Sequence, residues 1–230
     1  MNALKLSLAA FAASLALGGA ANAQEESPVS FSFNVGAASD YVFRGFTQTL
    51  EDPQVYGGID AAFGIGYAGV WASNVDFGDS TDFEFDLYAG VKPTLGPVSL
   101  DLAAIYYGYG GKPSGSGYAY WEFKAAGSVP AGPATLGVAT YYSPDFFGVD
   151  EEAFYAELNS AFAIPETKFS LSGAVGHQSL DVSSDYWTWN AGVGFALTDN
   201  VSFDLRYHDT DVKGTTLADE RVVIGVKAAF

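Results

Sequence analysis

The sequence predicts an all-β protein, a transmembrane antiparallel up-and-down β-barrel of about 12 strands. Three observations predict this fold class. Apolar and polar residues alternate with period two through most of the chain, short turns alternate with longer loops, and the apolar phase carries aromatic residues near the strand ends.

The composition narrows the function classes. The chain has 230 residues, of which 49% are hydrophobic, and its 27 acids against 10 bases give a net charge of −17. Such a charge repels phosphate backbones, so no nucleic-acid partner is expected. With no cysteine and two histidines, disulfides and cysteine-ligated metals are excluded, and neither a cofactor nor a metal site is expected.

The N-terminus resembles a secretory signal peptide. Lys5 precedes an apolar run over residues 6–17, and Ala21-Asn22-Ala23 follows as an A-x-A cleavage site. The run is shorter than the roughly 20 apolar residues of a membrane anchor. We therefore expect residues 1–23 to be a signal peptide and residues 24–230 to form a single barrel domain.

Alternation is clearest in residues 81–91, where apolar side chains alternate with Asp82, Glu84, Asp86, Tyr88 and Gly90. A helix would mix these acids into its apolar face. Twelve such stretches occur, and ten or fourteen strands are alternatives because short strands are easily merged or missed. The stretches cover residues 29–37, 55–65, 67–77, 83–91, 98–106, 119–129, 134–142, 154–164, 169–175, 187–197, 201–207 and 222–230.

The connections between these stretches are of two kinds. Short links rich in glycine, proline, aspartate and asparagine follow the even-numbered stretches, at residue 66 and at residues 93–97, 130–133, 165–167 and 198–200. Longer, more acidic links follow the odd-numbered ones, such as residues 46–53, 110–116, 143–152, 180–185 and 209–219. Outer-membrane barrels have this asymmetry, with short periplasmic turns and long external loops.

A soluble β-sandwich also alternates, so the direction of the apolar phase needs other arguments. The strands have the length of a tilted membrane crossing, and the chain ends on Phe230 in the apolar phase. We expect interfacial aromatic girdles made by Tyr41, Phe43, Trp71, Phe77, Trp121, Trp187 and Trp189. The expected location is the outer membrane of a Gram-negative bacterium, with lipid and lipopolysaccharide as surroundings and the barrel-assembly machinery contacting the strand that ends at Phe230.

The strand charges fall on the phase opposite the apolar residues. They are Asp40, Arg44, Asp60, Asp76, Asp82, Glu84, Asp86, Lys92, Asp101, Glu122, Lys124, Glu157, Asp204, Arg206, Arg221 and Lys227. Burying so many charges without water is costly, which favours a hydrated lumen. The pore-lining candidates are Arg44, Asp60, Asn74, Asp76, Glu84, Asp86, Glu122, Lys124, Glu157, Asp204 and Arg206.

Residues 39–49, Ser-Asp-Tyr-Val-Phe-Arg-Gly-Phe-Thr-Gln-Thr, are followed by Pro53 and by residues 56–60 and 69–76. This pattern over the first three strands resembles the N-terminal signature of the TorF family of porins. The resemblance implies an outer-membrane channel, names no substrate and lends no catalytic residues.

The signature residues also have a physical interpretation. Arg44, Asp60, Asn74 and Asp76 share the inward phase of neighbouring strands, where a guanidinium, two carboxylates and an amide are able to form a network. One interpretation is that the network ties these strands together. The other is that it forms a constriction or filter in the pore.

The expected function is a channel for passive diffusion of small hydrophilic solutes. Acidic loops above an acid-rich lumen predict a weak cation preference, although the loops are also explained as solvated, or as bridging divalent cations to lipid headgroups. A closed barrel with a structural or adhesive role is the alternative.

A different function class is raised by His177-Gln178-Ser179, since histidine and serine share the outward phase. This pair resembles the lipid-facing H-x-S of the outer-membrane phospholipase, whose histidine is oriented by an asparagine. Here the nearby Asn190 falls on the inward phase and the longer motif is absent, so no enzyme is expected.

Overall fold

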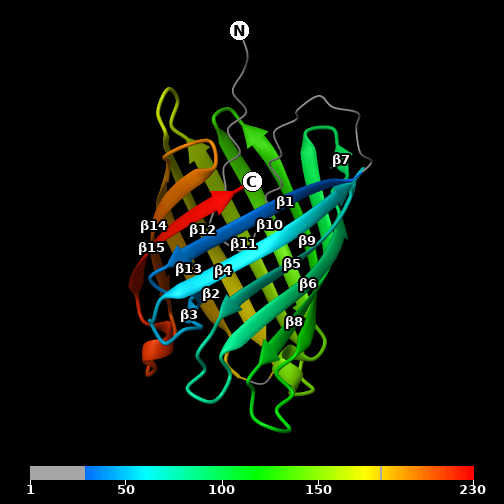
Figure 1. Ribbon diagram of the computed structural model, residues 1–230, viewed down its shortest axis with the longest axis vertical. Helices are drawn as coiled ribbons and strands as arrows, with labels where there is room; N and C mark the ends of the chain where they lie inside the picture. Colours follow the sequence, from blue (N-terminus) through cyan, green and yellow to red (C-terminus); the bar gives the residue numbers. More distant parts are fainter. Residues whose placement is uncertain (1–28, 182) are drawn as a thin grey trace.

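The computed structural model describes residues 29–181 and 183–230, which form a closed antiparallel barrel (Figure 1). The main sheet contains thirteen strands; β7 pairs only with β8, and the other twelve form the wall. Pairing of β6 with β8 closes the ring, and β1 pairs with β15. Closure satisfies the backbone of every wall strand, as hydrocarbon requires. The fold class and the number of wall strands are therefore as predicted, while the predicted signal peptide lies outside the described residues.

The structure places the strands close to the predicted stretches, although β12 continues five residues beyond its apolar stretch, which ends at residue 175. The wall strands are β1 (Ser30–Ala38), β4 (Gln54–Phe63), β5 (Gly66–Asn74), β6 (Phe83–Val91), β8 (Val98–Gly110), β9 (Tyr120–Ala131), β10 (Ala134–Ser143), β11 (Ala153–Ala163), β12 (Phe169–Leu180), β13 (Tyr186–Ala196), β14 (Val201–Thr210) and β15 (Arg221–Ala229). The remaining elements are short: β2 (Val42–Phe43), β3 (Phe46–Thr47), β7 (Thr94–Leu95) and the 3₁₀ helices η1 (Phe146–Gly148) and η2 (Thr216–Ala218). Within the described ranges, no helix is both long and apolar enough to cross a bilayer.

The two ends of the barrel differ as predicted. One end carries short turns at residues 64–65, 92–97, 132–133, 164–168 and 197–200, and we call it the turn end. The other, the loop end, carries residues 39–53, 75–82, 111–119, 144–152, 181, 183–185 and 211–220. Figure 1 shows the loop end at the bottom and β7 at the turn end.

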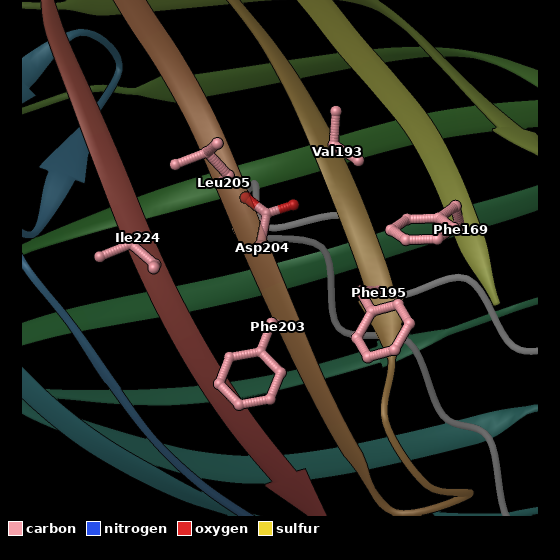
Figure 2. A pocket seen from close by; sticks show the side chains of 7 residues that line it. All are labelled: Phe169, Val193, Phe195, Phe203, Asp204, Leu205 and Ile224. Atoms are coloured by element: carbon pink, nitrogen blue, oxygen red, sulfur yellow. The ribbon is translucent and has the colours of Figure 1, made fainter.

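The outer face of the wall is apolar. Leu158 and Ile224 are 63% and 58% exposed, as expected of side chains that contact lipid rather than a protein core. A shallow depression near the turn end, drawn in Figure 2, is lined by Phe169, Val193, Phe195, Phe203, Leu205 and Ile224 beside Asp204. Its walls are the outward residues of β12 to β15, so it belongs to the lipid-facing surface.

The predicted aromatic girdle is partly wrong. Trp121, Trp187 and Trp189 are exposed on the outer face, as predicted. Tyr41 and Trp71 instead lie inside the barrel, where they contact each other, and Trp71 also contacts Tyr56. Phe43 and Phe77 lie inside as well, against Tyr107 and Tyr109. Alternation alone does not distinguish an aromatic ring that packs in the lumen from one that faces lipid.

The phase of β5 is the cause of two of these errors. Its outward residues are Ala68, Val70 and Ala72, whereas Tyr67, Ser73 and the following Val75 are buried inside. Because the outward residues of β5 are small, the phase that carries the aromatic residues has the stronger apolar pattern in the sequence, and it was predicted to face lipid. In the structure this phase fills the lumen.

Candidate functional site

The centre of the candidate site is a hairpin that folds into the barrel from the loop between β1 and β4. β2 pairs with β3 through Val42 with Thr47 and Phe43 with Phe46. Arg44 and Gly45 form the two-residue turn, with φ of 47° and 89°. Positive φ at both positions matches a type I′ turn, which glycine adopts freely and arginine adopts at a cost. We call residues 39–53 the inserted hairpin; its strands lie at the lower left of Figure 1.

Arg44 joins the tip of the inserted hairpin to the opposite wall. Its Nη1 and Nη2 donate to Glu122 Oε1 and Oε2 at 2.7 and 2.8 Å, and Nη1 also donates to Gln178 Oε1 at 3.1 Å. The side chains of Arg44 and Glu122 are 6% and 1% exposed. A bidentate pair of this kind combines charge with fixed geometry.

Aromatic rings surround the same guanidinium. Its carbon lies 4.4 Å from the ring centroid of Tyr155, 4.6 Å from that of Phe43 and 4.9 Å from that of Tyr141. Burial lowers the pKa of Arg44, but the charge and hydrogen bonds of Glu122 together with two nearby tyrosines raise it by more, so the pKa lies above its usual value. Arg44 therefore remains charged.

The rest of the tip fits tightly against β13 and β14. A Cβ added to Gly45 would collide with Thr210 Cγ2 and would lie 2.7 Å from Thr188 Oγ1. The ring of Phe46 packs edge-on against Tyr186, with centroids 5.2 Å apart. The tip therefore reaches both sides of the lumen, and any side chain at Gly45 would push it out of place.

The base of the inserted hairpin is held by a second group of contacts. Asp40 accepts from Arg221 Nη1 at 2.9 Å, from Thr47 Oγ1 at 2.6 Å and from Thr49 Oγ1 at 2.9 Å. Tyr41 donates its hydroxyl to Glu84 at 2.8 Å. The base is thus fixed to β15 and β6, while Arg44 fixes the tip to β9 and β12.

We expect Tyr41→Phe to loosen the base without removing it. A hydrogen bond to a charged group contributes about 1.5–3 kcal/mol, and the variant leaves Glu84 without this donor. Thermal unfolding in detergent should therefore show a lower midpoint than the wild type. Tyr106→Phe on the outer face of β8 is the control, and an equal loss in both variants would contradict a specific anchor.

Aromatic residues from several loops cover the adjacent part of the mouth. Phe147, at a positive φ of 54°, stacks on Tyr109 with centroids 5.7 Å apart and contacts Tyr120 at 4.8 Å. Phe77 and Tyr118 also pack against the ring of Phe147. The inserted hairpin and this cluster together cover the lumen at the loop end.

Toward the turn end the lumen is polar and partly accessible. Asp101 accepts from Tyr67 at 2.6 Å and from Lys124 at 2.9 Å, and Tyr88 donates to Asp60 at 2.6 Å. Asn34, Asp101, Ser128 and Lys227 are partly exposed, whereas Glu84, Glu122, Gln178, Thr188 and Thr210 at the level of the inserted hairpin are buried. Solvent thus reaches some of the inward side chains near the turns, whereas those at the level of the inserted hairpin are buried.

Most of the predicted pore-lining residues face inward. Glu157 accepts from Tyr155 and Asn159, and Arg206 contacts Asp204, Asn190 and Ser172. Asp86 lies on the same strand face as Glu84, and its buried Oδ1 has no hydrogen-bond partner among the described residues. Asp60, Glu84, Glu122, Lys124, Asp204 and Arg206 are all buried.

The predicted network of Arg44, Asp60, Asn74 and Asp76 does not form. Asn74 and Asp76 belong to the outward phase of β5 and its extension, and they bind backbone: Asn74 contacts Val55 N and Pro53 O, and Asp76 contacts Gly78 N. Arg44 lies on the inserted hairpin rather than on a wall strand. It therefore reaches across the lumen to Glu122 instead of along the wall to Asp60.

Gln178 and Gly45 are among the site residues that are absent from the predicted pore-lining set. Gln178 attracted attention only as the middle of His177-Gln178-Ser179, although it is the inward residue there. Gly45 carried a usable signal, because a glycine in a two-residue link between short apolar pairs indicates a hairpin turn.

The outward pair on β12 does not form a triad. Ser179 Oγ lies 3.5 Å from His177 Nδ1, and the wall neighbours of His177 are Ala156 and Trp187. Neither neighbour is an acid or an amide able to orient the imidazole.

The comparisons with known structures agree with this architecture. The KdgM porin aligns with a TM-score of 0.58 at 9% identity, covering 86% of this chain and 99% of that one. The same porin in complex with disordered oligogalacturonate aligns with a TM-score of 0.61, at the same identity and coverage. An outer-membrane channel from Pseudomonas putida F1 aligns with a TM-score of 0.56 at 10% identity, covering 89% and 96%. No curated protein matches the chain.

A closed barrel with an apolar outer face and a polar lumen defines the class of outer-membrane β-barrel proteins, whose place is the outer membrane of Gram-negative bacteria. The fold within this class is that of the porins and channels. Over residues 22–230 the chain matches the family described as bacterial protein of unknown function (Gcw_chp), and it belongs to that family.

Proposed function

We propose that the protein is an outer-membrane channel of the TorF porin type for passive diffusion of small hydrophilic solutes. The observation that carries the proposal is the inserted hairpin, which narrows a charged lumen through side-chain contacts at its tip. Twelve strands leave room for a narrow channel, between the filled barrels of eight strands and the wide porins. Charged side chains are less costly beside water than in a dry interior.

Single-channel recording on the refolded mature protein in planar bilayers tests this proposal. We expect discrete, small conductance steps, because the inserted hairpin occupies the loop-end half of the lumen. A silent bilayer with both the wild type and hairpin-loosening variants would favour the alternative, a closed barrel with a structural or adhesive role. The burial of the side chains at the constriction is the observation that favours this alternative.

The charges at the constriction support a weak cation preference. Glu84 and Asp86 on β6 and Glu122 on β9 face the lumen, and the basic residue Arg44 contacts Glu122. The oligogalacturonate of the KdgM complex is an anion. An acid-rich constriction predicts the opposite preference here, for neutral and cationic solutes.

Reversal potentials under a salt gradient measure this preference. We expect a cation-selective potential that declines as salt is raised, because the Debye length falls from about 10 Å at 0.1 M to about 3 Å at 1 M. Asp86→Asn should weaken the preference, while Asp199→Asn in a turn should leave it unchanged. An anion-selective potential would contradict the proposal.

The proposal includes no chemistry and no cofactor. Residues 1–23 are proposed to be removed on export, and the strand that ends at Phe230 to contact the assembly machinery, with lipopolysaccharide around the outer leaflet. Phospholipid hydrolysis in detergent should stay at background in both the wild type and Ser179→Ala. Hydrolysis that depends on Ser179 would restore the enzyme interpretation.

A further inference from the structure

The groups that hold the Arg44 guanidinium come from four consecutive wall strands. Glu122 lies on β9, Tyr141 on β10, Tyr155 on β11 and Gln178 on β12 (Figure 1). We call these four residues the guanidinium socket. The wall supplies two carboxylate oxygens, one amide oxygen and two aromatic rings, while the inserted hairpin supplies the cation and the ring of Phe43.

The socket is held in place by contacts that do not involve Arg44. Tyr107 donates to Glu122 Oε2 at 3.1 Å, and Gln178 Nε2 donates to the carbonyls of Phe154 and Ser179 at 3.3 and 3.2 Å. The amide is therefore turned so that its oxygen faces the lumen. Tyr155 donates its hydroxyl to Glu157 at 2.9 Å, which orients its ring. Such preorganisation lowers the cost of binding.

The geometry is specific for a planar cation. Two parallel N–H groups match the two oxygens of Glu122, a further N–H reaches Gln178, and the ring faces stabilise the delocalised charge. An ammonium ion is a point charge that does not make the same bidentate contact. The socket therefore distinguishes guanidinium from ammonium by shape.

We propose that the socket is a binding site for solutes that carry a guanidinium group, and that Arg44 is its internal competitor. This inference rests on the proposed channel function, because a solute reaches the socket through the lumen. A guanidinium solute that takes the place of Arg44 frees the tip of the inserted hairpin, so that the recognised solute also widens its own path.

The experiment titrates methylguanidinium against methylammonium on the Arg44→Ala variant in planar bilayers, with Arg44→Ala/Glu122→Gln as the matched control. We expect methylguanidinium to reduce the current at a concentration about tenfold lower than methylammonium, since losing one charged hydrogen bond corresponds to roughly that factor. The control should lose this difference. Equal block by both cations, or an unchanged difference in the control, would overturn the inference while leaving the channel proposal intact.

Thermal unfolding in detergent separates the two proposals if the variant barrel carries no current. Methylguanidinium should raise the unfolding midpoint of Arg44→Ala more than methylammonium does, and should not do so in the control. Stabilisation without current would support the socket and contradict the channel, whereas equal midpoints with both cations would overturn the socket. If Arg44→Ala does not refold, the same titrations are made on Arg44→Lys, which keeps a charge beside Glu122.

Discussion

Replacing Arg44 with alanine is expected to raise the single-channel conductance several-fold. The side chain spans the gap between the hairpin tip and the wall, so its removal both vacates that volume and releases the tip from β9 and β12. Cation selectivity should rise as well, because the constriction loses its guanidinium while Glu84, Asp86 and Glu122 remain. Bilayer recording of conductance and reversal potential measures both changes.

The same substitution should destabilise the barrel, since Glu122 stays buried without its partner. Removing one member of a buried ion pair costs about 3–5 kcal/mol. Arg44→Ala/Glu122→Gln is the control, because a neutral amide of the same shape removes the unpaired charge. We expect it to recover much of the stability and keep the high conductance. Unchanged conductance and selectivity in Arg44→Ala, with stability alone reduced, would mean that Arg44 only ties the inserted hairpin to the wall.

The wall of the barrel was predictable because lipid imposes a strict period. An outward position must be apolar along each whole crossing, and turns and loops must alternate, so strands such as β6 and β15 are legible from residue order alone. The apolar pattern of β12 ends at Val175, because its later outward residues, His177 and Ser179, are polar near the loop end.

The lumen was less predictable because its side chains obey no such rule. Tyr67 and Trp71 pack against other rings inside the barrel as well as they would pack at the interface with lipid. Their phase therefore depends on which neighbours they meet across the lumen. This information is tertiary, and it decided the positions of Asn74 and Asp76.

The position of the inserted hairpin inside the barrel could not be predicted from the residue pattern, for a different reason. Residues 39–47 continue an approximate alternation beyond β1, which made Arg44 look like a wall residue. The chain turns inward because Asp40 pairs with Arg221 and Arg44 pairs with Glu122, partners 181 and 78 residues away. A glycine at the turn indicates a hairpin, but no local signal says that it lies inside the barrel.

A disulfide between the hairpin tip and the wall should make the conductance depend on redox state. The chain contains no cysteine, so Gly45→Cys and Thr188→Cys form a single defined pair. A Cβ at Gly45 would lie 3.3 Å from Thr188 Cβ, slightly below the roughly 3.5–4.5 Å of disulfides. Thr210→Ser removes the methyl group that would collide with this Cβ and keeps the hydroxyl that donates to Ala218 O.

Cysteine at φ +89° is strained, so the reduced variant should release the tip and conduct more than the wild type. Oxidation should return the tip to the wall and lower the current, and a reductant added to the same bilayer should restore it. The two single-cysteine variants in the Thr210→Ser background control for side effects of the substitutions and should not respond to redox. Because the comparison is made within one molecule, a change in stability does not explain it: identical currents in the oxidised and reduced pair would mean that the inserted hairpin does not control the pore.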